Sequence, residues 1–224
     1  MIFVTGSSGF VGRAVLYILN QNNINYQTVS RDVLYGGLSE FLDGYSNITL
    51  IHCAWSMNYI DPGNEEKNQQ LNDAILRALD RVDKMVFISS IQALTSSNKY
   101  SKEKNRWEGI FNNAAMKPNS HLSVLYLPHI VAPEVGMNHH SVIYKFYKNW
   151  KKGRALNVYE DIDISYTDMY SLQRVLLQAI SGSNSLRLTP EYNVMKVSQI
   201  KSVFLENDQI CPILESLKNS RIVF

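Results

Sequence analysis

The chain has 224 residues, of which 45% are hydrophobic and 19% charged, a balance typical of a soluble globular protein with a sizeable core. The formal net charge of +2 argues against nucleic acid as a partner, because it implies no strongly basic surface. No segment approaches the roughly 18 consecutive apolar residues of a membrane span, and the first residues are typical of a strand rather than a signal peptide. Cys53 and Cys211 show no disulfide pattern, so we expect a protein of the reducing cytoplasm with no membrane partner.

Strand and helix patterns alternate through the first two thirds of the chain. Runs rich in β-branched and other apolar residues predict strands at Ile2–Thr5, Tyr26–Val29, Ile48–Ala54, Met85–Ile88 and Leu122–Leu127. Apolar residues at helical spacing predict helices at Val11–Leu19, Asn72–Leu79 and Lys102–Asn112. This alternation predicts an α/β protein with a Rossmann-type, doubly wound parallel sheet covered by helices on both faces.

The pattern becomes less regular after Pro133. It predicts helices at Ser141–Trp150, Ser171–Ser181 and Ile210–Asn219, and a short strand at Leu156–Tyr159. No repeat or flexible linker separates the two parts. We therefore expect a dinucleotide-binding domain over residues 1–132 and a small substrate-binding region over residues 133–224, packed as one body. The pair His139–His140 has no partners at metal-ligand spacing, so no metal site is predicted.

A glycine-rich turn follows the first predicted strand and opens the first predicted helix. It runs Thr5-Gly6-Ser7-Ser8-Gly9-Phe10-Val11-Gly12. Glycines at this spacing allow a tight turn, a close approach of the backbone to a pyrophosphate, and close packing of helix on strand. The helix then points free N–H groups at the phosphates. The turn therefore predicts a dinucleotide site.

The spacing TGxxGxxG resembles that of the extended short-chain dehydrogenase/reductase superfamily, in its NAD-dependent epimerase/dehydratase group. Further segments are similar to family motifs and occur in the family's order: IHCAW at 51–55, VFISSIQAL at 86–94, YSKEK at 100–104, VLYLPHIVAP at 124–133 and GRALNVYEDIDISYTDMYSL at 153–172. The resemblance implies an NAD(P) cofactor contacted by Thr5, Gly6, Ser8, Gly9, Phe10, Val11, Gly12, Cys53, Ala54, Trp55, Tyr100, Lys104, Pro128 and His129.

The end of the second predicted strand bears on the choice of cofactor. In this fold an acid at that position binds the ribose of NAD, whereas a nearby arginine suits the 2′-phosphate of NADP. Ser30 stands where the acid is expected, and Arg31 follows it. A hydroxyl and a guanidinium match a phosphate dianion, which favours NADP. NAD remains an alternative cofactor, because a shift of one residue in the alignment would place the carboxylate of Asp32 at the position of the ribose-binding acid.

Tyr100 and Lys104 are predicted to project from one face of a helix. An ammonium group close to a phenol stabilises the phenolate and lowers its pKa, so we expect Lys104 to bring Tyr100 into range for proton transfer. The resemblance implies that Ser90 and Tyr100 hold the substrate oxygen, and that Lys104 binds the nicotinamide ribose. It further implies substrate contacts from Ser90, Ile91, Gln92, His129 and Arg154.

The chain also departs from the family's pattern. The loop between Ser90 and Tyr100 is shorter than usual, and Tyr126 and His129 replace an arginine and an asparagine. Glu108, by contrast, agrees with the family, which often has an acidic residue at this position. Dehydration is disfavoured, because Ile91 and Gln92 stand where a dehydratase has an Asp-Glu pair.

The expected function is reduction of a keto group on a nucleotide-diphosphate deoxysugar, with NADP, in surface polysaccharide or related biosynthesis. The alternatives are an epimerase that uses bound NAD, a reductase of small carbonyls, and a non-catalytic NAD(P)-binding sensor or scaffold. Retention of both Tyr100 and Lys104 favours an enzyme over a sensor. A homodimer is also possible.

Overall fold

The computed structural model describes residues 1–57, 63–114, 120–136, 138 and 141–206. The predicted helix Ile210–Asn219, the pair His139–His140 and Cys211 lie outside these residues. Within the described part, no helix is long and apolar enough to cross a membrane. The same part has no group of three or more His, Cys, Asp or Glu side chains that could hold a metal ion.

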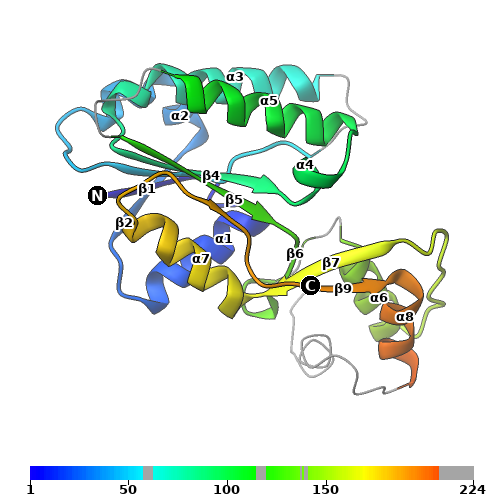
Figure 1. Cartoon of the computed structure of the whole chain (residues 1–224). Coiled ribbons are helices and arrows are strands. Elements are labelled where there is room, and N and C mark those ends of the chain that lie inside the picture. The colour runs from blue at the N-terminus through cyan, green and yellow to red at the C-terminus, as the bar shows by residue number, and fades with distance from the viewer. Residues whose placement is uncertain (58–62, 115–119, 137, 139–140, 207–224) are drawn as a thin grey trace. The chain divides into compact units, whose positions relative to one another are not determined.

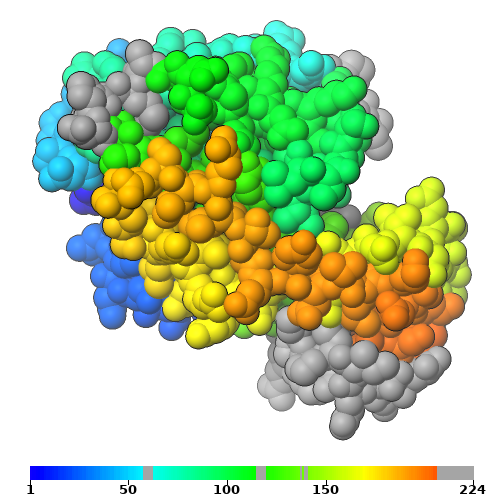
Figure 2. Space-filling model, in the orientation of Figure 1, coloured from blue at the N-terminus to red at the C-terminus, as the bar shows by residue number. Residues whose placement is uncertain are grey.

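The chain divides into two compact units. The first consists of Met1–Leu127 together with Gln173–Pro190, and the second of Pro128–Leu172 together with Glu191–Phe224. This differs from the expected organisation, in which everything after residue 132 belongs to the second region. The segment Gln173–Pro190 returns to the first unit because its backbone is bound there: the Lys84 amino group donates to the carbonyl of Ile180, and a short strand in it pairs with the first unit's sheet. Figure 2 shows this segment, coloured from yellow to orange, against the blue and green atoms of the first unit.

The first unit is built on a parallel sheet of six strands in the order β2-β1-β3-β4-β5-β8 (Figure 1). The strands are β1 Ile2–Thr5, β2 Tyr26–Val29, β3 Thr49–His52, β4 Lys84–Ser90, β5 His121–Leu127 and β8 Arg187–Leu188. All its strand pairs are parallel, and the strand order reverses between β1 and β3. The predicted doubly wound Rossmann-type fold is confirmed, and its switch point, where such folds bind ligands, lies between β1 and β3.

Helices cover both faces of this sheet (Figure 1). One face carries α2 Arg31–Leu42, α3 Asn64–Arg77 and α5 Lys99–Asn113, and the other carries α1 Phe10–Gln21 and α7 Met169–Ser181. A further short helix, α4 Gln92–Thr95, lies in the loop between β4 and α5, and a 3-10 turn, Leu79–Arg81, follows α3. Phe3, Leu50 and Phe87 from the central strands are fully buried in the core beneath α2, α3 and α5.

The second unit contains a sheet of three strands in the order β6-β7-β9: β6 His129–Val131, β7 Asp163–Asp168 and β9 Asn193–Lys196. Strands β6 and β7 are parallel, whereas β7 and β9 are antiparallel. Its helices are α6 Val142–Lys151 and α8 Val197–Glu206, with a 3-10 turn at Pro133–Val135. The predicted strand Leu156–Tyr159 is wrong, because that segment pairs with no strand; Leu156 is instead buried in the unit's core.

Candidate functional site

The predicted cofactor and catalytic residues of the first unit gather at one edge of its sheet. The glycine turn follows β1, Ser30 follows β2, Cys53 follows β3, and Ser90 ends β4. Because these strands are parallel, all four positions lie at their carboxyl ends, where α/β sheets bind ligands.

The glycine turn is made by close contacts between backbone atoms. Gly6 has a φ of +65°, and a Cβ there would lie 2.5 Å from the Cα of Ala54. A Cβ on Gly12 would lie 2.1 Å from the carbonyl oxygen of Gly6. A Cβ on Gly9 would meet only that same oxygen, at 3.2 Å, so Gly9 faces more open space than the other two. The turn therefore needs Gly6 and Gly12 for its shape, whereas Gly9 leaves room beside the backbone.

The N-terminus of α1 suits an anion. Gly9 is its N-cap residue and provides no side-chain cap, and the first turn contains no acidic residue. The N–H groups of Phe10, Val11 and Gly12 therefore have no capping side chain, and the positive end of the helix dipole is uncompensated. Ser8 is exposed, and its carbonyl accepts a hydrogen bond from Arg13 at 2.7 Å. A pyrophosphate fits this arrangement of donors.

Thr5, which we expected to contact the cofactor, has a fully buried side chain bonded within the protein. Its hydroxyl lies 2.8 Å from Nδ1 of His52, and Nε2 of His52 lies 3.1 Å from Oδ1 of Asn72 on α3. Burial, and to a smaller extent the charge of Lys104, lower the pKa of His52 to about 3, although the hydrogen bond with Asn72 acts in the opposite direction. The neutral His52 thus joins β1, β3 and α3, and the sequence motifs did not identify this link.

Tyr100 and Ser90 meet at the end of β4. The Asn98 side chain caps α5 by accepting a hydrogen bond from the N–H of Ser101, so the helix begins at Lys99 rather than at the expected Lys102. This places Tyr100 in the first turn of α5. A side-chain hydrogen bond with Ser90 lowers the pKa of Tyr100, but burial outweighs it and raises that pKa to about 12. The short loop between β4 and α5 therefore still allows Ser90 to reach Tyr100.

Lys104 lies one helical turn after Tyr100 and is buried. Its amino group donates to the carbonyl of Ile88 at 2.8 Å and lies 3.5 Å from the ring centroid of Trp55. Burial lowers the pKa of Lys104 to about 7. The expectation that Lys104 lowers the Tyr100 pKa is wrong for this arrangement, because Lys104 loses its proton well below the pH at which Tyr100 ionises.

Ser30 and Arg31 stand at the N-terminus of α2. Strand β2 ends at Val29, and the Ser30 hydroxyl caps α2 by accepting a hydrogen bond from the N–H of Val33 at 3.2 Å. Arg31 and Asp32 are exposed residues of the first helical turn. Ser30 is therefore the residue that directly follows the strand, while Asp32 belongs to the helix.

The remaining expected cofactor and substrate residues are divided between the two units. Ile91 is half-buried and packs against the core of the first unit, and Gln92 is exposed at the start of α4. Cys53 is half-buried, and burial raises the pKa of its thiol to about 12. Pro128, His129 and Arg154 belong to the second unit. Burial lowers the pKa of His129, whereas Arg154 is exposed.

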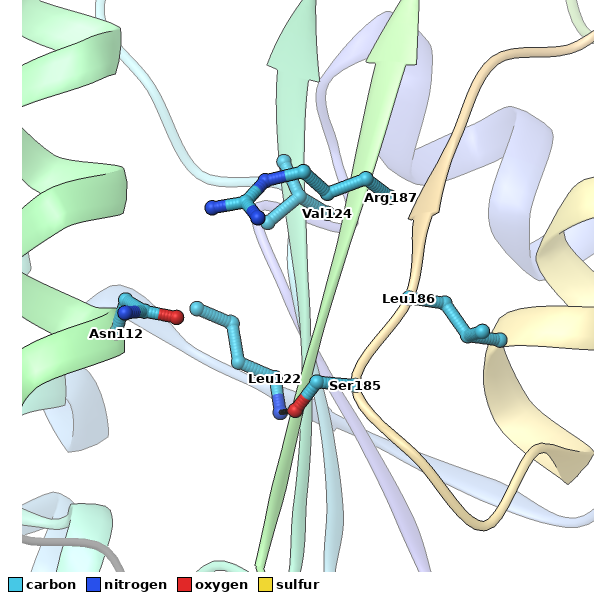
Figure 3. A pocket seen from close by; sticks show the side chains of 6 residues that line it. All are labelled: Asn112, Leu122, Val124, Ser185, Leu186 and Arg187. Carbon is cyan, nitrogen blue, oxygen red and sulfur yellow. Dashed lines mark hydrogen bonds between the residues drawn. The ribbon is translucent and has the colours of Figure 1, made fainter.

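Glu108 is bound by two residues that are distant in the sequence. The Tyr126 hydroxyl donates to both of its carboxylate oxygens, at 2.7 and 2.8 Å, and Arg187 on β8 pairs with it at 3.0 Å. Arg187 lines a hollow of about 190 Å³ between β5, β8 and α5, and Figure 3 shows its guanidinium extending from β8 toward α5. In the family that the sequence resembles, an arginine stands at the position of Tyr126. Here the arginine that pairs with Glu108 is Arg187, from a different strand. No local motif indicated Arg187, because it lies far along the chain.

The chain matches no protein-family model and no curated protein. Its fold is similar to that of MoeE5, solved in complex with UDP-glucose and NAD, with a TM-score of 0.75 and 17% identity over 95% of this chain and 83% of that one. UDP-N-acetylglucosamine 4-epimerase from Bacillus cereus matches with a TM-score of 0.70 and 16% identity, over 98% of this chain and 82% of that one. UDP-glucose 4-epimerase from Thermotoga maritima matches with a TM-score of 0.73 and 15% identity, over 92% of this chain and 81% of that one. The likeness shows the fold.

Proposed function

We propose that this protein is an NADP-dependent oxidoreductase that reduces a keto group on a nucleotide-linked deoxysugar, in surface polysaccharide or related biosynthesis. The observation that supports it best is the Ser90–Tyr100 hydrogen bond, with Lys104 one turn further along α5, at the sheet edge that also holds the glycine turn. The nucleotide sugar is inferred from fold neighbours such as MoeE5, whose solved complex contains UDP-glucose and NAD.

The proposed roles divide along the sheet edge. The glycine turn and the N-terminus of α1 would hold the pyrophosphate. A bound nicotinamide would supply the hydride. Ser90 and Tyr100 would then hold the substrate's carbonyl oxygen, and the Tyr100 hydroxyl would give it a proton as the hydride arrives.

The protonation state of Tyr100 favours reduction over epimerisation. With its pKa raised to about 12, Tyr100 keeps its proton at neutral pH and can donate it. An epimerase must first remove a proton from a sugar hydroxyl, for which a neutral phenol is a poor base. Epimerase with bound NAD remains the second candidate, because several structures of similar fold are UDP-sugar 4-epimerases.

The decisive experiment measures loss of NADPH with a nucleotide-linked 4-keto-deoxysugar. Tyr100→Phe removes one oxygen and keeps the ring, so turnover should fall by about 10²–10⁴-fold while NADPH affinity stays unchanged. Tyr26→Phe, at the opposite end of its strand from the site, is the matched control and should keep full activity. If Tyr100→Phe is as fast as the parent protein, Tyr100 is not the acid. If NADPH binds but no nucleotide sugar reacts, the sensor hypothesis replaces this one.

The cofactor choice needs its own measurement. Arg31 is exposed beside the N-terminus of α2, where it could pair with a 2′-phosphate. NADPH should therefore bind about tenfold tighter than NADH. Arg31→Ala should remove most of that difference in calorimetry, whereas Arg77→Ala, on the exposed surface of α3, should not. Equal affinities in the unmodified protein would overturn NADP and favour NAD bound through Asp32.

A further inference from the structure

Three aromatic rings surround the amino group of Lys104. Its Nζ atom lies 3.5 Å from the ring centroid of Trp55, 5.0 Å from that of Phe87 and 5.9 Å from that of Tyr100. Aromatic faces bind cations in this way, and the attraction grows when the cation is desolvated. The Lys104 residue is only 4% exposed. We name Trp55, Phe87 and Tyr100 the aromatic cage; its cation is the protein's own lysine.

The Trp55 ring is held in place from two sides. The next residue, Ser56, is clamped to α3: Asn68 accepts from its N–H at 2.8 Å and donates to its carbonyl at 3.1 Å. Asn64 donates to the same carbonyl at 3.2 Å. The ring of Trp55 also lies edge-to-face with Phe87 and with Tyr100, at centroid distances of 6.3 and 6.4 Å. Trp55 is therefore the anchored member of the pair, and Lys104, with its flexible side chain, is the member that can move.

We propose that Trp55 is a positioning residue. It holds the Lys104 amino group at the Ile88 carbonyl in the free protein, and Lys104 leaves the Trp55 ring only when a dinucleotide binds. The holding is a property of the free protein, whereas the release rests on the proposed function, in which Lys104 contacts the cofactor. If Lys104 must leave the Trp55 face to reach a dinucleotide, breaking that contact opposes binding. The other titratable groups that act on the Lys104 amino group are Glu103 on α5 and His52 and Cys53 at the end of β3.

The holding step is tested without any ligand, by NMR of protein labelled at the lysine Cε positions. Lys104→Met identifies the Lys104 signal. A methylene over an indole face is shifted upfield, so the Lys104 signal should be displaced in the parent protein, less so in Trp55→Phe, and least in Trp55→Leu, where the more distant Phe87 and Tyr100 rings remain. The Lys104 titration should move about one pKa unit lower in Trp55→Leu, because the ring no longer stabilises the cation. An ordinary Lys104 shift in the parent, or an unchanged one in Trp55→Leu with the remaining signals native, would overturn the proposal.

The release step is tested by calorimetry with NADPH. Trp55→Leu should bind it about two- to thirtyfold more tightly than the parent, and Trp55→Phe should fall between them. Equal or weaker binding by Trp55→Leu, with a native NMR spectrum, would mean that Trp55 does not oppose cofactor binding and would overturn the release. If none of the proteins binds either dinucleotide, the proposed function fails, while the NMR shifts still decide whether Trp55 holds Lys104.

Discussion

After β1 the chain enters α1 through a turn shaped by backbone contacts, whereas after β4 it reaches α5 through a loop whose chemistry depends on side chains. In the first region, Gly6 and Gly12 are required because any Cβ would collide with neighbouring backbone atoms. In the second, the protonation of Tyr100 and Lys104 depends on burial, and the Lys104 amino group also contacts the rings of Phe87 on β4 and of Trp55 after β3. The comparison teaches that the shape of a backbone-made site follows from steric contacts between backbone atoms, whereas the charge of a side-chain site depends on burial and on neighbouring rings.

The largest effect is expected in the backbone-made turn, from Gly12→Val. A side chain at Gly12 would lie 2.1 Å from the Gly6 carbonyl oxygen and 2.7 Å from the Cα of Ser7, and neither backbone atom can give way. We expect a loss of more than about 3 kcal/mol in the free energy of unfolding, measured in urea. The matched control is Gly109→Ala, at an exposed helical site with open space around it, which should not destabilise the chain. A stable Gly12→Val protein would show that the turn is not sterically constrained.

Gly9→Val separates binding from folding in the same turn. Gly9 has a φ of −70°, which valine adopts readily, and its Cβ would meet only one oxygen, at 3.2 Å. The variant should fold, but its side chain would occupy the space that a pyrophosphate needs. We expect dinucleotide affinity to fall by at least about a hundredfold, or about 2.7 kcal/mol, in calorimetry. Undiminished binding would mean that this turn does not hold phosphate.

The buried His52 links the end of β1 to α3, and it should make stability depend on pH. Its pKa of about 3 in the folded protein lies below the ordinary 6.5, so the unfolded chain takes up a proton between these values and the folded one does not. Stability is therefore complete above about pH 6.5 and is lost as the pH falls toward 3. Between about pH 7.5 and about pH 5, His52 should account for about 2 kcal/mol of lost stability. His52→Gln should be less stable at neutral pH but should show a smaller acid-induced loss; an equal loss would contradict a buried neutral His52.

The smallest effect concerns the side-chain network on the far part of α5. Arg187 pairs with Glu108, but its side chain is 65% exposed, whereas that of Glu108 is 10% exposed. Solvent weakens such a pair, so Arg187→Ala should cost about 1 kcal/mol or less in urea unfolding. Arg187→Lys, which keeps the charge but loses the planar guanidinium, should cost less still. No change in either variant would show that the two Tyr126 hydrogen bonds suffice for Glu108.

Some elements of the fold were not predicted from the sequence, and each omission has a physical reason. Helix α2 was not predicted, because Gly36 and Gly37 interrupt its pattern and Gly37 has a non-helical backbone conformation. Strand β8 has only two residues, and its pairing with β5 defines it. The return of Gln173–Pro190 to the first unit likewise depends on long-range contacts that no local pattern encodes.

The sequence by itself determined the alternation of strands and helices, the glycine turn, and the order in which Ser90, Tyr100 and Lys104 occur. These features depend on neighbours in the chain: the steric limits of a turn, the period of a helix and the preference of β-branched residues for strands. Only the tertiary structure decided the charge of Lys104 and the partners of His52 and Glu108. Their surroundings come from β3, β4, β8 and α3, and both desolvation and cation–π attraction depend on distances in space rather than in sequence.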